Sequence, residues 1–323
     1  MTNYKKKLIV GSRSSHLAMA QTNDFINKLL KAYPDIDKDA IEIKAIKTTG
    51  DLNLTTRLDK LGGKGLFAKE IETEILNGTI DVGIHSMKDM PAEENEDLMI
   101  GCWLERMDFR DVMISLDPLS FSDLNKNSVL GTSSIRRRSQ VLNIRDDLCI
   151  KSLRGNVDTR IKKLNENQFD AIILSMAGLQ RLSLDHLTTY IFSTEEILPA
   201  ACQGAVGVQM LSSNINLKSF LNPINHEPTE LQCSAERAVI KMIKANCNSP
   251  IGILAVSEDD KLLMRCDIFD HGGKKIYANS IKNFCSQSKN IVQEMGNNIL
   301  STLGQDTIDK LDKLKNDFNY TPN

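Results

Sequence analysis

Short apolar runs alternate with segments of helical periodicity over the first half of the chain, and this alternation limits the fold more than any other feature. We expect strands at 8–10, 41–48, 81–85, 129–130, 148–152 and 171–174, and helices at 17–33 and 68–76 and from 136 and 159. A helix between two strands returns the chain to the end of the sheet where the first strand began. The pattern therefore predicts parallel sheets of the α/β class.

The order of elements changes from about residue 227. A long helix (229–244) precedes three strands (251–256, 262–269 and 275–281) and a final amphipathic helix (287–303). Hairpin-linked strands with helices outside them indicate a small α+β domain. The charged tail, 309–323, is expected to be partly disordered.

Composition excludes several classes of protein. A chain of 323 residues suggests two or three domains, and a net charge of −2 argues against a general nucleic-acid binder. No apolar run approaches the roughly 18 residues of a membrane span, and the N-terminal apolar stretch is too short for a signal peptide. The seven cysteines include no CxxC pair. We therefore expect a cytoplasmic protein.

Arginine and hydroxyl residues recur at the junctions between a predicted strand and the predicted helix that follows it. The segments are GSRSS at 11–15, GTSSIRRR at 131–138 and SLRGNVDTR at 152–160. A helix N-terminus offers unpaired N–H groups and a positive dipole end, and arginine grips carboxylates or phosphates with two donors. Three such segments indicate a ligand with several negative groups.

Seven strings, in order along nearly the whole chain, resemble the porphobilinogen deaminase family. They are GSRSS, GGKGLF at 62–67, HSMKDMP at 85–91, GTSSIRRR, SLRGNVDTR, CQGAVG at 202–207, and AER followed by CNSPIG at 247–252. The resemblance implies an enzyme that joins four porphobilinogen units head to tail with release of ammonia. It also implies a dipyrromethane cofactor attached to a cysteine by a thioether.

The same resemblance implies a fold and a division into domains. Two doubly wound α/β domains would be hinged as in periplasmic binding proteins, with a smaller α+β domain carrying the cysteine. We expect the first domain at 1–104 with 204–222, the second at 105–203 and the third at 223–323. A monomer is expected, with no nucleic-acid or membrane partner.

The ligand of such an enzyme explains the arginines, because each pyrrole ring carries an acetate and a propionate. By resemblance, one set of residues holds the cofactor: Lys88, Thr132, Ser134, Arg136, Arg137 and Arg160. A second set holds the incoming porphobilinogen and the growing chain: Arg13, Ser15, Arg154 and Arg160. Without the resemblance, three adjacent arginines are more simply a solvated helix face. We expect Arg138 at the surface.

Asp89 is the candidate acid–base residue. The reaction needs a proton for the departing amine and a negative charge beside the cation that forms, and one carboxylate can serve both needs. Asp89 follows a predicted strand, at the end where α/β sheets bind ligands. The simpler interpretation is a turn aspartate before Pro91. We interpret His85 as a structural residue.

Cys247 is the candidate attachment residue, because its string corresponds to the family's cofactor cysteine. The string departs from the family pattern at Ala245-Asn246, where glycine and a small residue are usual. It departs again at Ser249, where a β-branched apolar residue is usual. Cys202, at a position where the family commonly has glycine, is a weaker rival for attachment.

The glycine-rich loop is interpreted as a lid over the site rather than as a nucleotide-binding loop, because it lacks GxxxxGK[ST]. Its residues are Gly62, Gly63, Lys64, Gly65 and Phe67. The histidines show no metal-ligand spacing with the cysteines, so no metal is expected.

A different class of protein stays open: a non-enzymatic protein that binds a carboxylate or oxyanion between hinged domains. Such a protein would normally carry a secretion signal and would not need Asp89 or Cys247.

Overall fold

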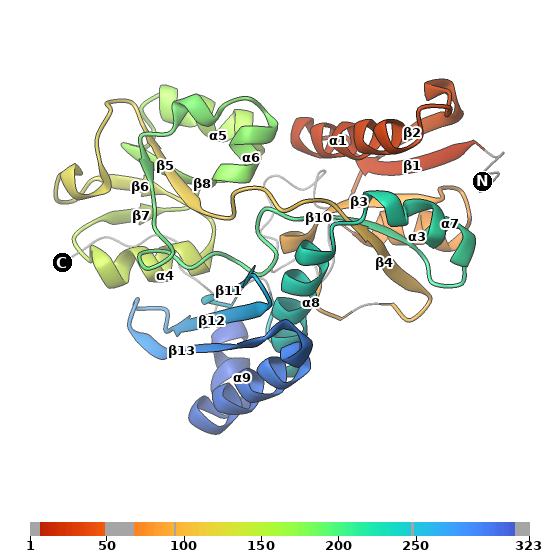
Figure 1. Cartoon of the computed structure of the whole chain (residues 1–323). Helices are drawn as coiled ribbons and strands as arrows, with labels where there is room; N and C mark the ends of the chain where they lie inside the picture. Colours follow the sequence, from red (N-terminus) through yellow and green to blue (C-terminus); the bar gives the residue numbers. More distant parts are fainter. Residues whose placement is uncertain (1–6, 49–67, 94, 247–248, 314–323) are drawn as a thin grey trace. The chain divides into compact units, whose positions relative to one another are not determined.

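The computed structural model describes residues 7–48, 68–93, 95–246 and 249–313 (Figure 1). The chain divides into two units: Met1–Met107 with Ala205–Glu230, and Asp108–Gly204 with Leu231–Asn323. Within the described residues the strands form three sheets, one in the first unit and two in the second. None of the described helices is long and apolar enough to cross a bilayer.

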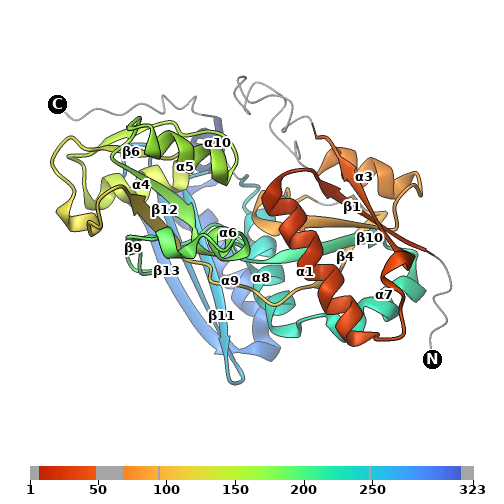
Figure 2. The same cartoon turned by 90° about the horizontal axis from the view of Figure 1, so that it is seen from above.

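The sheet of the first unit has the strand order β2-β1-β3-β10-β4. Its strands are β1 (Leu8–Arg13), β2 (Ile41–Ile46), β3 (Val82–Ser86), β4 (Leu98–Trp103) and β10 (Val206–Leu211). The helices of this unit are α1 (His16–Ala32), α3 (Lys69–Leu76) and α7 (Ile215–Leu221). Helix α1 packs on β1 and β3 (Figures 1 and 2) and buries Phe25 and Leu29 against them.

Strands β1, β2 and β3 are parallel, as predicted, whereas β10 is a strand that the sequence pattern did not predict. Strand β10 runs antiparallel to both of its neighbours, β3 and β4. In sequence, β10 comes after β5 to β9, which form a sheet of the other unit. Local alternation of strands and helices therefore could not indicate its place or its direction.

The first sheet of the second unit has the order β7-β6-β8-β5-β9. Its strands are β5 (Asp111–Ser115), β6 (Val129–Gly131), β7 (Cys149–Lys151), β8 (Ala171–Ser175) and β9 (Tyr190–Ile191). Its helices are α4 (Ile135–Ile144), α5 (Val157–Asn165) and α6 (Met176–Arg181). Here too parallel strands β7, β6 and β8 are followed by an antiparallel one, β5. Both sheets thus place the ends of their parallel strands beside helix N-termini.

The third sheet is antiparallel and consists of β11 (Ile251–Glu258), β12 (Lys261–Phe269) and β13 (Lys275–Phe284). Helices α8 (Glu227–Met242) and α9 (Ser288–Leu303) share one apolar core with it (Figure 1). The expected fold class, two α/β parts and a smaller α+β part, is confirmed.

The tail was predicted to be partly disordered, and its first residues form a helix. A helix, α10 (Gln305–Lys313), buries Ile308 and Leu311 in the core of the third sheet. These two side chains are three residues apart and so lie on one helix face. The tail is rich in charged residues, so its composition alone did not indicate this apolar face.

Candidate active site

A pocket in the first unit brings together three of the predicted site residues. Arg13 is the last residue of β1, Ser15 precedes α1, and Asp89 follows β3, and all three line the pocket. Ser15 caps α1 by accepting a hydrogen bond from the N–H of Ala18 at 3.3 Å. The pocket therefore combines a cation, a helix N-terminus and a carboxylate at the ends of parallel strands.

Asp89 lies on a short 3-10 turn, Met87–Asp89, whose ends are fixed. Met87 and Met90 are buried on either side of the carboxylate, while Asp89 is exposed. The N–H of Met87 donates to the carbonyl of Ala205 at 3.1 Å, just before β10. Lys88 is half-buried on the same turn. The two buried methionines hold Asp89 at the pocket, where its carboxylate is in contact with solvent.

The strand end before this turn is braced by side chains from α1. The amide of Gln21 donates to the hydroxyl of Ser86 at 2.7 Å, and the hydroxyl of Thr22 donates to that of Ser12 at 2.7 Å. His85 is buried and also lines the pocket. These bonds join α1 to the ends of β1 and β3, next to Arg13 and close in sequence to Asp89.

The second group of predicted residues lies in the second unit, in the loops that follow β6 and β7. The hydroxyl of Ser133 joins the two loops by donating to the carbonyl of Leu153 at 2.7 Å. Ser134 caps α4, and Asn156 caps α5. The loops therefore place Thr132, Ser134, Arg154 and Arg160 near two helix N-termini; Arg154 and Arg160 are half-buried.

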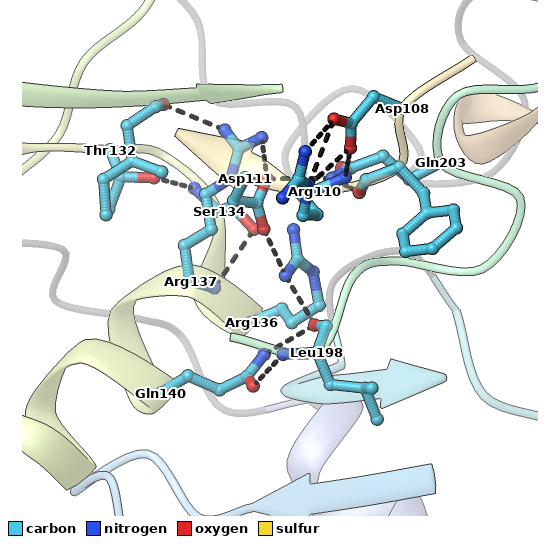
Figure 3. A network of polar contacts seen from close by, with 12 residues as sticks. Asp108, Arg110, Asp111, Thr132, Ser134, Arg136, Arg137, Gln140, Leu198 and Gln203 are labelled. Carbon is cyan, nitrogen blue, oxygen red and sulfur yellow. Dashed lines mark hydrogen bonds and ion pairs between the residues drawn. The ribbon is translucent and has the colours of Figure 1, made fainter. Parts of the chain in front are cut away.

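Arg136 and Arg137, in the first turn of α4, share a buried carboxylate, Asp111 (Figure 3). Nη1 of Arg136 is 2.7 Å from Oδ2 of Asp111 and also donates to the carbonyl of Leu198 at 2.8 Å. Arg137 donates to Oδ1 from Nε at 3.0 Å and from Nη2 at 2.7 Å, and to the carbonyl of Ile173 from Nη1 at 3.0 Å. The exposed fractions are 4% for Arg136, 5% for Arg137 and 0% for Asp111.

The charge balance of this cluster is two cations to one anion. Burial opposes ionisation of Asp111, but Arg136 and Arg137 outweigh it and hold the pKa of Asp111 well below its usual range. Gln203 adds a donor, its Nε2 lying 2.9 Å from Oδ1 of Asp111. The Nε atom of Arg136 is buried and has no hydrogen-bond partner among the described residues. The cluster thus keeps one positive charge in excess, and the Nε donor of Arg136 is unused.

Two family models together match most of the chain. The first, "Porphobilinogen deaminase, dipyromethane cofactor binding domain", matches residues 8–219. The second, "Porphobilinogen deaminase, C-terminal domain", matches residues 230–301. The chain belongs to the porphobilinogen deaminase family.

Relatives named porphobilinogen deaminase are similar over most of their length. The protein of Lysinibacillus sphaericus is 44% identical over 260 residues, covering 80% of this chain and 83% of its own. That of Geobacillus is 41% identical over 279 residues, covering 85% and 88%. A chloroplastic one from Pisum sativum is 39% identical over 274 residues, covering 84% and 74%. Among solved structures, the methionine-binding protein MetQ aligns with a TM-score of 0.43 and 10% identity, over 69% of this chain and 91% of its own.

Some residues expected from the porphobilinogen deaminase resemblance lie outside the described part of the structure. They are Cys247 and the loop residues Gly62, Gly63, Lys64, Gly65 and Phe67. The other predicted residues fall into the two groups above, one in each unit.

Cys202, the rival to Cys247 for attachment, is buried. Burial and the neighbouring Cys233 raise the pKa of the Cys202 thiol well above its ordinary value. A thioether requires a thiolate that a ligand can reach. The backbone of Cys202 has φ 59°, in the left-handed region, which is consistent with the glycine common at this position in the family.

Sequence reasoning missed a group of possible metal ligands around Cys202. The sulfur atoms of Cys202 and Cys233 and a carboxylate oxygen of Glu236 lie within 4.8 Å of one another. Cys233 and Glu236 lie three residues apart in α8, but Cys202 comes from a distant segment, so no motif spacing indicated the group. Glu236 also accepts hydrogen bonds from the N–H groups of Cys202 and Ala255, so it has a structural role in joining α8 to β11.

The sequence analysis placed Arg138 wrongly and did not single out Asp111. Arg138 was expected at the surface but is buried, and its Nη1 donates to the carbonyl of His271 at 3.1 Å in the turn between β12 and β13. That turn covers the face of α4 that carries Arg138, which the sequence analysis expected to be exposed to solvent. Asp111 gave no signal beyond an acidic residue at a strand start, since its partners lie 25 and 26 positions later.

Proposed function

We propose that this chain joins four porphobilinogen units head to tail, with release of ammonia, on a covalently attached dipyrromethane primer. The product is the linear tetrapyrrole hydroxymethylbilane. The observation that carries the proposal is the pocket of Arg13, Ser15 and Asp89 in a chain that the family models match from 8 to 219 and from 230 to 301. Family membership favours this function over a non-enzymatic carboxylate-binding protein.

The residues of the second unit fit a dipyrromethane, which carries four carboxylates on two rings. The loops after β6 and β7 offer hydroxyls and arginines beside two helix N-termini, and the buried Nε of Arg136 has no partner in the described residues. When bound, this cofactor supplies the free pyrrole position from which the chain grows. We propose that the cofactor is held by Thr132, Ser134, Arg136, Arg137 and Arg160 of the second unit and by Lys88 of the first unit.

The hydrogen bonds to Asp111 determine which N–H groups of Arg136 and Arg137 remain available to a ligand carboxylate. All three guanidinium nitrogens of Arg137 donate within the protein, so we propose that Arg137 contributes charge and orientation. Arg136 donates from Nη1, which leaves its other nitrogens for a carboxylate. Asp111 is therefore a positioning residue for both arginines.

Asp89 is proposed as the acid–base residue. It is exposed at a pocket that also contains Arg13, so a substrate carboxylate can bind the arginine while the amine faces Asp89. A carboxylic acid there gives a proton to the departing amine, and the carboxylate that remains stabilises the positive charge left on the ring. Arg13 and Ser15, with Arg154 and Arg160, are proposed to bind incoming porphobilinogen and the growing chain.

Cys247 is the proposed attachment residue, and the loop containing Gly62 to Phe67 the proposed lid. We propose a cytoplasmic monomer without nucleic-acid or membrane partners. We also propose three domains, 1–104 with 204–222, 105–203 and 223–323, with the last two carrying the two sheets of the second unit.

Stoichiometry tests the function. The purified protein is mixed with porphobilinogen, and ammonia, consumed substrate and linear tetrapyrrole are measured together. We expect one ammonia for each porphobilinogen consumed and one tetrapyrrole for every four. Binding without release of ammonia would instead indicate the non-enzymatic carboxylate-binding protein.

A further inference from the structure

Cys202, Cys233 and Glu236 meet in the interior of the second unit. Their two sulfur atoms and one carboxylate oxygen lie within 4.8 Å of one another, and their exposed fractions are 1%, 0% and 0%. Cys233 and Glu236 are three residues apart in α8 and so share a helix face, whereas Cys202 belongs to the turn before β10. Three atoms of the kinds that bind metals are therefore gathered between a helix and a turn, away from solvent.

The carboxylate of Glu236 is held in a fixed orientation. Its Oε2 accepts from the N–H of Cys202 at 2.5 Å, and its Oε1 accepts from the N–H of Ala255 at 2.7 Å. A carboxylate has about four lone-pair sites, so two such bonds do not exhaust its capacity. The same side chain can therefore fix the turn that carries Cys202 and offer an oxygen ligand beside both thiols.

The charges around the cluster favour a divalent ion. Burial and the neighbouring Cys233 and Glu236 raise the pKa of the Cys202 thiol, whereas Arg237 lowers it. Arg237 is itself buried, with 8% of its surface exposed, and its charge balances that of Glu236 while both thiols keep their protons. A divalent cation that displaces two thiol protons leaves this balance unchanged. The exchange therefore adds no net charge to the interior, which would be costly.

We propose that Cys202, Cys233 and Glu236 bind a zinc ion that ties the turn before β10 to α8. Two zinc–thiolate bonds form, two protons leave to solvent, and no electron is transferred. Ligands of a tetrahedral zinc ion lie about 3.6–3.8 Å apart, so atoms that are now within 4.8 Å need to approach by only about 1 Å. Water supplies the fourth ligand.

The kind of metal follows from the ligands. Thiolates are soft ligands that select zinc over magnesium or calcium, which prefer oxygen. The site contains no histidine, which is why the spacing of histidines and cysteines predicted no metal. The family commonly has glycine at position 202, so this site is a feature of the present chain and is independent of the reaction with porphobilinogen.

The test titrates zinc into the purified full-length protein after treatment with a chelator. Native mass spectrometry counts the bound ions, and an indicator in weak buffer counts the protons released. We expect one ion and two protons per chain, with a higher melting temperature because the ion binds the folded state. Cadmium, used as a second probe, should give the ultraviolet charge-transfer band of a thiolate complex.

Three variants locate the site. Cys202→Gly suits the backbone, since φ is 59° at this residue, and Cys233→Ala removes the second sulfur. Each should weaken zinc binding by at least about 100-fold and abolish the cadmium band. The control is Cys266→Ala, which removes an equally buried thiol from β12 and should bind zinc as the wild type does.

Zinc binding at wild-type strength in Cys202→Gly would overturn the proposal, as would a wild-type protein that binds no ion. Binding without the release of two protons would also overturn it, because the thiols would then not be the ligands. If Cys233→Ala does not fold, Cys202→Gly decides the question alone, since it introduces the residue common in the family.

Discussion

Arg137 donates two hydrogen bonds to a single oxygen of Asp111, from Nε at 3.0 Å and Nη2 at 2.7 Å. The other oxygen of Asp111 accepts from Arg136 at 2.7 Å. One carboxylate at the start of β5 therefore fixes two arginines in the first turn of α4 (Figure 3).

Asp111→Asn should destabilise the second unit strongly. The substitution leaves two buried guanidinium charges without their counter-ion, and breaking a buried pair from one side costs about 3–5 kcal/mol. Chemical denaturation followed by circular dichroism measures the loss. The control is Asp108→Asn, because the partner Arg110 is 43% exposed and such pairs contribute about 0–1 kcal/mol. An equal loss of unfolding free energy in the two variants would show that the buried Asp111 pairs stabilise the fold no more than an exposed pair does.

The same cluster predicts how stability depends on pH. The pKa of Asp111 is lowered in the folded protein, so its contribution is present above the unfolded value of about 4 and is lost as pH falls through the folded value. The difference in unfolding free energy between wild type and Asp111→Asn should be constant between about pH 5 and 7. It should shrink only below about pH 4. A difference that already declines near neutral pH would contradict this assignment.

Asp89→Asn should abolish most turnover without harming the fold. Asparagine keeps the size of the side chain but cannot give and take a proton, and loss of general acid–base catalysis costs about 10²–10⁴-fold. Asp89 is exposed, so the melting temperature should hardly move. Asp97→Asn, an exposed aspartate of the same unit, is the control. Turnover within about tenfold of wild type would make Asp89 a turn residue.

Substitution of the arginines by leucine should separate the two proposed roles. Arg136→Leu and Arg137→Leu should leave mainly cofactor-free protein, whereas Arg13→Leu and Arg154→Leu should acquire the cofactor and stall at early covalent intermediates. Each charge-assisted bond contributes about 1.5–3 kcal/mol, so the effects are large enough to observe. Intact-mass ladders after addition of porphobilinogen distinguish the classes. The same ladder in all four variants would refute this division of labour.

The sequence predicted elements that depend on neighbours along the chain and missed those that depend on distant ones. Strand β1, helix α1 and the turn of Asp89 follow from local periodicity and from their place in one α/β unit. The position of β10 and the pairing of Asp111 depend on contacts between segments far apart in sequence. Arg138 is buried by a turn 133 residues later, which no local pattern of charges could indicate.

The central claim is a dipyrromethane attached at Cys247, and the intact mass of the protein as purified tests it most directly. The account predicts an excess over the sequence mass equal to one dipyrromethane. Peptide mapping should find all of it on Cys247 and none on the buried Cys202. An active protein with no excess mass, or with the adduct on Cys202, would contradict the account.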